Sequence, residues 1–166
     1  MEIVSDSRGK NIFCPSTFQP KVHITLAQSS AKIHCYTNKV SGPQLLHYLL
    51  INQNNFQHIH SLHLSFCPDI MEKDSLHLLN LDHVLEMSIR KPQVQEKYQI
   101  KFDSTLVKLK TLRLISFEYL NLEEILFGRQ MNISRLTIED TKNLFLKENA
   151  FLEMPSLRYL GFAEIE

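Results

Sequence analysis

Three apolar residues with one fixed spacing recur five times along this chain. In each set the second apolar residue follows three positions after the first, and the third follows two positions after the second. The first members are separated by 25, 25, 24 and 24 residues, at positions 59, 84, 109, 133 and 157. So regular a period predicts a solenoid, in which each repeat packs against its neighbours. We call these apolar residues anchors; they are Ile59, Leu62, Leu64; Val84, Met87, Ile89; Leu109, Leu112, Leu114; Ile133, Leu136, Ile138; and Leu157, Leu160, Phe162.

This period lies within the roughly 20–29 residues that are typical of leucine-rich repeats. Residues 56–166 are therefore predicted to form about five irregular repeats of an α/β leucine-rich-repeat solenoid, with a parallel β-sheet on the concave face. Short helical or 3₁₀ turns are expected on the convex side, over residues 122–127 and 147–152. We also expect the repeats to continue beyond the chain end, because the apolar end of a solenoid needs a cover.

Two other sets of equivalent positions bear on this alignment of the repeats. Three positions before each first anchor the residues are mostly apolar, namely Phe56, Leu81, Leu106, Gln130 and Met154. Eight positions after each first anchor, leucine-rich repeats usually have Asn or Cys, but the residues here are Cys67, Pro92, Phe117, Thr141 and Ile165. The hydrogen bonds of an asparagine ladder must therefore come from other groups, and the turns are expected to vary.

Residues 1–55 do not contain the repeat and are predicted to form an N-terminal cap region. Apolar and polar residues alternate over 22–26 and, less strictly, over 31–36, which is typical of β-strands. The intervening residues suit a short turn. We therefore expect a β-hairpin at about residues 22–36 that covers one open end of the solenoid core.

The composition describes a folded chain without a signature of nucleic-acid, membrane or catalytic function. Among 166 residues, 18 basic side chains balance 18 acidic ones without a long run of one sign, so nucleic acid is not expected as a partner. None of the four glycines makes a phosphate-binding loop, and we expect no enzyme activity and no cofactor. No signal peptide or transmembrane segment is visible, so the chain is intracellular or a piece of a longer one.

Three cysteines and a glycosylation sequon favour an extracellular setting. A disulfide between Cys14 and Cys35, which flank the first strand of the hairpin, is the first choice. A Cys35–Cys67 bridge, which would tie the cap to the first repeat, is the alternative, and the sequence alone does not choose between them. In the sequon Asn132-Ile133-Ser134, Asn132 is expected at the exposed edge of its strand.

The residues that alternate with the anchors are expected on the concave face, the commonest contact surface of a solenoid. Arg90, Arg113 and Arg135 are predicted to form a basic stripe there, flanked by Glu86 and Glu139. Arginine suits carboxylate pairing and desolvated interfaces better than lysine does. The alternative is a solvated sheet face held by small cross-strand pairs. The candidate protein-binding residues are His63, Glu86, Ser88, Arg90, Arg113, Arg135, Thr137 and Glu139.

His58, His60 and His63 cluster in the sequence, but no metal site is expected from them. His58 and His60 flank a buried anchor, whereas His63 should face outward, so the three rings would not converge as zinc ligands must. Surface histidines are the expected outcome. A pH-sensitive contact is the milder alternative, because histidine titrates near neutrality.

Several stretches of the cap and the repeats share a pattern with one family of receptors. They are Phe13-Cys14-Pro15, Gln19-Pro20-Lys21-Val22-His23-Ile24, Lys32-Ile33-His34-Cys35 and Leu62-His63-Leu64-Ser65-Phe66-Cys67. Through them the whole chain resembles the N-terminal end of an insect Toll receptor ectodomain. The resemblance implies a non-catalytic recognition segment at the cell surface that binds a cytokine-type protein, Spätzle. It also implies receptor dimerisation and signalling through a cytoplasmic domain that is not visible in this sequence.

One stretch fits a rival class of repeat better. The pattern Ile59-x-x-Leu62-x-Leu64-x-x-Cys67-x-x-Ile70 resembles the cysteine-containing repeat of intracellular F-box adaptors. The other four repeats lack that cysteine, and no F-box precedes them. An intracellular leucine-rich-repeat adaptor that holds a protein partner is therefore the alternative function.

Overall fold

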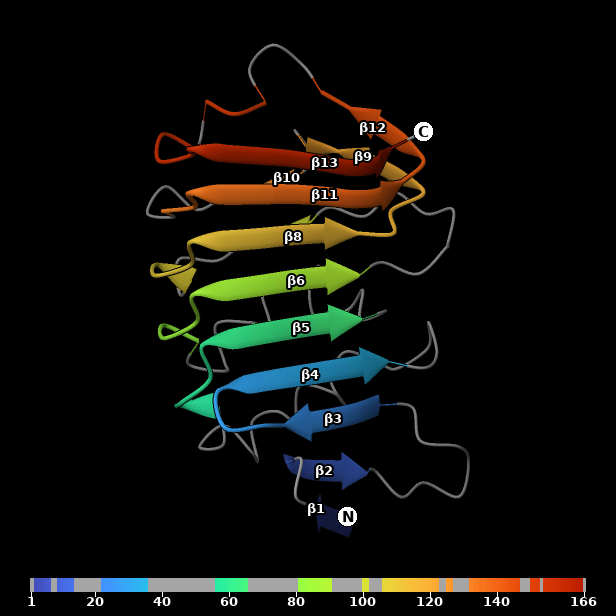
Figure 1. The fold of residues 1–166 in the computed structure, drawn as a ribbon, viewed down its shortest axis with the longest axis vertical. Coiled ribbons are helices and arrows are strands. Elements are labelled where there is room, and N and C mark those ends of the chain that lie inside the picture. Colours follow the sequence, from blue (N-terminus) through green and yellow to red (C-terminus); the bar gives the residue numbers. More distant parts are fainter. Residues whose placement is uncertain are drawn as a thin grey trace.

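The computed structural model describes residues 2–6, 9–13, 22–35, 56–65, 81–90, 100–101, 106–122, 125–126, 132–146, 150–152 and 154–165. These residues form one nine-stranded sheet and two small ones (Figure 1). The large sheet is antiparallel from its first strand to the fourth and parallel from there on. Its strands, in order, are β1 (Glu2–Asp6), β2 (Gly9–Phe13), β3 (Val22–Leu26), β4 (Ser30–Cys35), β5 (Ser61–Ser65), β6 (Glu86–Arg90), β8 (Thr111–Ile115), β11 (Arg135–Thr141) and β13 (Tyr159–Ile165).

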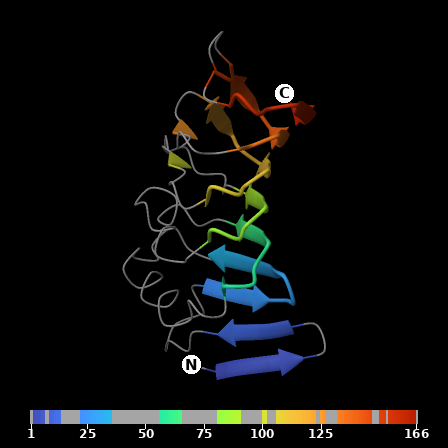
Figure 2. The same cartoon turned by 90° about the vertical axis from the view of Figure 1, so that its left-hand side faces the viewer.

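Short strands lie behind the C-terminal part of the large sheet (Figure 2). β7 (Ile100–Lys101) pairs in parallel with β10 (Ile125–Leu126), and β9 (Tyr119–Asn121) pairs in parallel with β12 (Asn143–Phe145). A helical turn over residues 122–127 is therefore wrong at β10, because its main-chain groups pair with the preceding repeat instead. Residues 150–152 form a turn, and 147–149 lie outside the described residues. The described ranges contain no α-helix, so they show a β-rich, solenoid-like fold rather than an α/β one.

We call each of the strands β5, β6, β8, β11 and β13, together with its three anchors, a rung. The second and third anchors lie within the strand, and those of neighbouring rungs are paired residue for residue. Leu62 is paired with Met87, Met87 with Leu112, and Leu112 with Leu136. The anchors of the first four rungs are all at most 5% exposed. A slip of one residue between strands would turn anchors toward solvent, so burial fixes the register that the sequence period predicts.

The same main-chain hydrogen bonds recur at the start of the rungs. The N–H of Ile59 donates to the carbonyl of Phe56 (3.0 Å), which folds the Phe56 ring into the core at 1% exposure. The carbonyl of His60 then accepts two successive N–H groups from the next rung, those of Leu85 (2.8 Å) and Glu86 (3.0 Å). The turn recurs as Val84 to Leu81, Leu109 to Leu106 and Leu157 to Met154. Gln130, the polar member of the Phe56 column, lies outside the described residues.

Left-handed residues form the corners at the strand ends of the last three rungs. Ser116, Asp140 and Glu164 occupy equivalent positions and have φ angles of 58°, 50° and 53°. Beyond this corner, the side-chain amide of Asn143 donates to the carbonyl of Glu118 in the preceding rung (2.9 Å). Part of the hydrogen bonding that an asparagine ladder would supply therefore comes from Asn143, two positions after Thr141, where the ladder asparagine would stand.

The N-terminal region has a hairpin where the sequence predicts one and two strands that the pattern did not reveal. β3 and β4 pair antiparallel, and Ile24 and Ile33 are each 1% exposed, so the hairpin adds to the core but is not the end of the sheet. β1 and β2 extend the sheet beyond the hairpin. The sequence over residues 2–13 is too polar to give a clear strand signal. β2 joins the sheet by main-chain pairing with the edge of β3, and β1 by pairing with β2.

The fifth rung has the same sequence pattern as the others but is exposed. Leu160 and Phe162 are paired with Leu136 and Ile138, yet they are 36% and 47% exposed. The four inner rungs are covered on both sides, whereas β13 is the last strand of the sheet. Burial of an anchor therefore depends on its place in the stack as well as on the pattern.

We expect Leu112→Ala to lower the free energy of unfolding by roughly 2–5 kcal/mol, because it leaves a cavity at a position that is 0% exposed. Leu160→Ala, at the equivalent anchor of the fifth rung, should cost less than about half as much, because that side chain already contacts solvent. Urea denaturation of both variants and the wild type measures the two losses. Equal losses would contradict the difference in burial between the two rungs.

Candidate functional site

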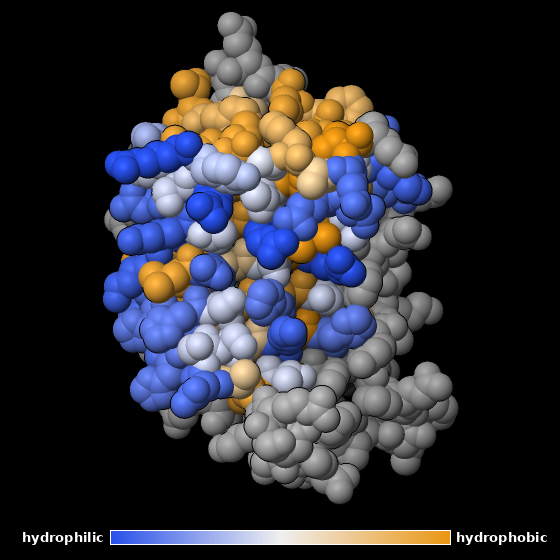
Figure 3. Space-filling model, in the orientation of Figure 1, coloured by the Kyte–Doolittle hydropathy of each residue, from blue (hydrophilic) through white to orange (hydrophobic). Residues whose placement is uncertain are grey.

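The side chains that alternate with the anchors form the face of the sheet that points away from the core, which we call the open face (Figure 3). Polar side chains cover it over the middle strands, and apolar ones gather at the C-terminal end. Three columns run across the parallel strands at matched register. They are Ser30, Ser61, Glu86, Thr111, Arg135, Tyr159; Lys32, His63, Ser88, Arg113, Thr137, Gly161; and His34, Ser65, Arg90, Ile115, Glu139, Ala163.

The three arginines lie on neighbouring strands but in three different columns. Arg90 is on β6, Arg113 on β8 and Arg135 on β11, each two residues out of register with the next, so they form a diagonal. Glu86 and Glu139 lie at the ends of the opposite diagonal, which also passes through Arg113. Strand spacing and rise put neighbours on a diagonal about 8 Å apart. We call these five residues the charged cross, in which Arg113 is the centre.

Arg113 makes a bidentate ion pair with Glu139. Its Nη2 donates to Oε1 at 2.8 Å and to Oε2 at 3.0 Å, and its Nε donates to Oε1 at 3.1 Å. The two side chains are 49% and 29% exposed, so water screens the pair and its contribution to stability is modest. Its main effect is geometric, because it holds the guanidinium plane in one orientation on the open face.

His63, on β5, lies between two serines of the open face. Its Nε2 is 3.2 Å from Ser61 Oγ, and its Nδ1 is 2.5 Å from Ser88 Oγ on the neighbouring strand. Burial lowers the pKa of His63 below its ordinary 6.5, and the cations Lys32 and Arg113 act in the same direction against Glu86. The ring is therefore neutral at pH 7, with one nitrogen donating and the other accepting.

A tyrosine covers the open face near its C-terminal end. The guanidinium carbon of Arg135 lies 4.9 Å from the centroid of the Tyr159 ring, which is cation–π geometry. The ring also lies over Gly161, where an added Cβ would be 3.0 Å from Tyr159 Cε1 and 3.1 Å from Thr137 Cγ2. Thr137 Oγ1 is enclosed there, and it has no hydrogen-bond partner within the described part of the chain.

The structure puts all eight predicted protein-binding residues on one face, but not all of them are accessible. Ser88 is only 9% exposed, because the His63 ring lies against it. Lys32 was missed by the sequence analysis and is exposed beside His63 on the open face. The alternation within β4 could have indicated it, because Ala31 and Ile33 continue the anchor columns of the repeats.

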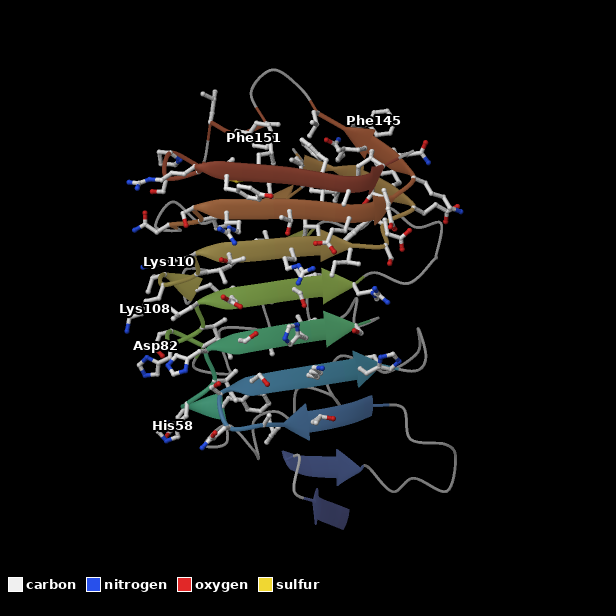
Figure 4. The ribbon with its side chains drawn as sticks, viewed as in Figure 1. His58, Asp82, Lys108, Lys110, Phe145 and Phe151 are labelled. Carbon is white, nitrogen blue, oxygen red and sulfur yellow. The ribbon has the colours of Figure 1, made fainter. Side chains whose placement is uncertain are left out.

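His58 and His63, which cluster in the sequence, lie in different parts of the fold. His58 and Asp82 lie at the edge where the parallel strands begin, together with Lys108 and Lys110, whereas His63 is on the open face (Figure 4). Within the described ranges, no group of three or more His, Cys, Asp or Glu side chains is placed to hold a metal ion. Those ranges also contain no helix with the length and apolar character needed to cross a bilayer.

The features that bear on an extracellular setting lie at opposite ends of the sheet. Cys35 is disulfide-bonded and 2% exposed, and the candidate partners Cys14 and Cys67 lie outside the described residues. Asn132 is exposed just before β11, and its Oδ1 accepts a hydrogen bond from Ser156 Oγ at 2.6 Å. The sequon therefore lies at the strand-start edge rather than on the open face.

The lowered pKa of His63 makes stability depend on pH. Between its folded pKa and 6.5 the unfolded chain binds more protons at this position, so the stability that His63 contributes is complete above 6.5 and is lost as the pH falls. The free energy of unfolding of the wild type should therefore drop relative to His63→Gln between about pH 7.5 and about pH 5. Denaturant titrations at both pH values measure this, and a gap that does not change with pH would contradict it.

Comparisons with known proteins add little to this geometry. No protein-family model matches the sequence, and no curated protein matches it. A chain from the structure of the Toll–Spätzle complex, described as a molecular hub in Drosophila development and innate immunity, superposes with a TM-score of 0.44 at 11% sequence identity. The superposition covers 97% of this chain and 27% of that chain, so this chain spans about a quarter of its length. A likeness at this level carries no argument about fold or function.

Proposed function

We propose that this chain is a non-catalytic protein-recognition segment of an extracellular, Toll-like leucine-rich-repeat receptor. On this proposal it binds a cytokine-type protein ligand, similar to Spätzle, in innate immune or developmental signalling. The observation that carries the proposal is the charged cross on the open face. It presents three arginines and two glutamates on three adjacent strands whose backbone is fixed by the buried anchors.

The charged cross suits a protein partner better than a small ligand or a polyanion. Positive and negative side chains alternate around its four ends, over an area three strands wide. A complementary surface must therefore present both carboxylates and cations at matching positions. A uniformly acidic partner would gain from the arginines and lose at Glu86 and Glu139. Arg135 over the Tyr159 ring adds two of the residue types that are enriched among the residues with the largest binding energies in protein interfaces.

The rigidity of the open face also supports recognition. The Arg113–Glu139 pair and the serines around His63 hold polar side chains in place before a partner arrives. Binding then orders few side chains, and each rotamer that is already fixed saves part of the entropy lost on association. The open face is accordingly a preorganised polar surface on a sheet.

The cap and the sequon support the extracellular setting of this proposal. A disulfide at Cys35 is expected to persist only where the environment is oxidising. Asn132 is the asparagine of the one Asn-x-Ser/Thr triplet in the sequence, and its side chain is exposed. The rival, an intracellular adaptor, would keep its thiols reduced and would carry no glycan.

We expect charge reversal at the charged cross to weaken ligand binding without unfolding the chain. Arg113→Glu and Arg135→Glu should each raise the Kd for recombinant Spätzle by about tenfold or more, because each removes an arginine from the contact surface. Lys108→Glu, which changes an exposed charge away from the open face, is the matched control. Isothermal titration calorimetry gives Kd, and circular dichroism checks the fold.

A double variant separates binding from folding in this experiment. Arg113→Glu with Glu139→Arg restores the ion pair inside the chain but reverses both charges toward the ligand. It should recover any stability lost in Arg113→Glu while binding stays weak. Wild-type affinity in the double variant and in Arg135→Glu would move the contact away from the open face.

Secretion should leave two marks on the chain. Expressed through the secretory pathway, the protein is expected to carry a glycan on Asn132 and a disulfide at Cys35. Mass spectrometry before and after glycosidase treatment, with Asn132→Gln as the unglycosylated control, checks the first, and a thiol count checks the second. An unmodified Asn132 together with three free thiols would favour the intracellular adaptor.

A further inference from the structure

The open face over β4, β5 and β6 is rich in cations and hydrogen-bond donors. Two neighbouring columns cross these strands at matched register, and we call their six residues the basic patch; they are Lys32, His63, Ser88 and His34, Ser65, Arg90. On the open face of these three strands the one described acid is Glu86, which lies at a corner in the remaining column. The patch is part of the polar area over the middle strands in Figure 3.

Two cations of the basic patch are not neutralised by the described part of the chain. Lys32 and Arg90 are both exposed, and neither makes an ion pair with a described carboxylate. Arg113, by contrast, is held by Glu139. Two uncompensated charges on a rigid sheet attract an anion that approaches from outside.

His63 shows the sign of the electrostatic potential at the middle of the patch. Burial is the largest cause of its lowered pKa, and Lys32 and Arg113 each lower that pKa more than Glu86 raises it. The cations therefore outweigh the acid at the ring, and the potential there is positive. An anion placed beside the ring would be stabilised by the same charges.

The spacing of the patch suits one oxyanion. Neighbouring strands lie about 4.8 Å apart and alternate residues of one strand about 6.6 Å apart, so the backbones of Lys32 and Arg90 are separated by about 12 Å. The midpoint between them lies on β5, between His63 and Ser65. Both cationic side chains are long enough to bend inward and meet one anion over that point.

We propose that the basic patch binds the sulfate ester of a tyrosine on the protein ligand. Ammonium, guanidinium, hydroxyl and imidazole groups all donate hydrogen bonds, and the free oxygens of a sulfate monoester only accept them. A phosphate monoester has a second pKa of about 6, so in mild acid it brings a hydrogen of its own to a site that presents donors. The donor set therefore favours sulfate.

The borders of the patch favour a single anion over a polysulfated chain. Glu86 occupies one corner, and Glu139 lies two strands beyond Arg90 in the same column. A second sulfate placed toward the charged cross would therefore meet a carboxylate. A protein surface can present one sulfate beside cations, and in proteins that ester is carried by tyrosine. The source of the ester rests on the proposed function, whereas the anion site itself does not.

Binding is expected to be coupled to a proton on His63. An anion beside the ring favours its charged form and raises its pKa from the lowered value. The protonated form therefore binds the ester better, and affinity should increase as the pH falls. His34 is the other histidine of the patch, and the groups that act on the His63 ring are Ser61, Ser88, Lys32, Glu86 and Arg113.

The test is a titration with N-acetyl-sulfotyrosine amide, in which the sulfate is the one charge. We expect saturable shifts of the amide NMR signals of β4, β5 and β6, with a Kd on the order of 1 mM for so small a ligand. Lys32→Ala should raise this Kd by about fivefold, and Lys32→Arg should restore it. Glu86→Gln should lower it by about threefold, because it removes the nearby acid. Lys108→Ala, which removes an exposed cation away from the open face, is the control.

The pH dependence tests the role of His63. Between pH 7.5 and pH 5.5 the Kd of the sulfate ester should fall by about threefold. His63→Gln should lose most of this gain, whereas His34→Gln should keep the part that is due to His63. At pH 5.5 the phosphotyrosine analogue carries nearly the same charge as the sulfate ester, and it should bind several-fold more weakly because of its hydrogen.

Four results would overturn the proposal. An absence of saturable shifts on β4, β5 and β6, or a Kd that Lys32→Ala leaves unchanged, would remove the anion site. Tighter binding of the phosphotyrosine analogue at pH 5.5 would assign the site to another ester, and tighter binding of a heparin disaccharide would assign it to a glycan. These titrations contain no protein ligand, so their failure leaves the proposed function standing. Weak binding of Spätzle at the charged cross would likewise leave the anion site standing.

Discussion

The stacking of anchors at matched register is the interaction on which the rest of the structure depends. Each inner strand buries its anchors between the strands on either side, and a shift of one residue would expose all of them. This constraint fixes the backbone, and the backbone fixes where the alternating side chains lie. The open face is therefore positioned by residues that are fully buried, such as Leu112 and Leu114.

Charge organisation on the open face follows from that register. Arg113 contacts Glu139 because the pairing of anchors sets the register of β8 and β11. In this register Glu139 lies two residues beyond the position directly opposite Arg113. The pKa of His63 is lowered because the same alignment partly buries its ring and puts the cations Lys32 and Arg113 in its column. The arrangement of the polar open face thus results from a core that is packed for stability. Leu160 and Phe162 are exposed for the same reason, because β13 is paired with β11 alone among the described strands.

Much of this arrangement could be predicted from the sequence, and the failures have physical causes. The recurring triplets predicted the parallel sheet, its register and the outward residues, because burial of one face imposes a period of two on every strand. The turn over residues 122–127 was predicted wrongly at β10, since local propensity gave way to main-chain pairing with β7. β1 and β2 were missed because β2 depends on the edge of β3, and β1 on the edge of β2, rather than on a pattern of their own.

By itself, the sequence determined the period of the fold and which residues alternate between core and surface. These are local properties, set by the spacing of apolar side chains along one strand. Only the tertiary structure decided that the diagonal of arginines and the diagonal of glutamates share Arg113 as their centre. It also decided that Ser88 is covered, and that Leu160 is exposed while Leu136 is buried. Those outcomes depend on contacts between residues about one repeat apart and on how many strands lie on each side. No single stretch of sequence contains that information, because it arises only when the rungs are stacked.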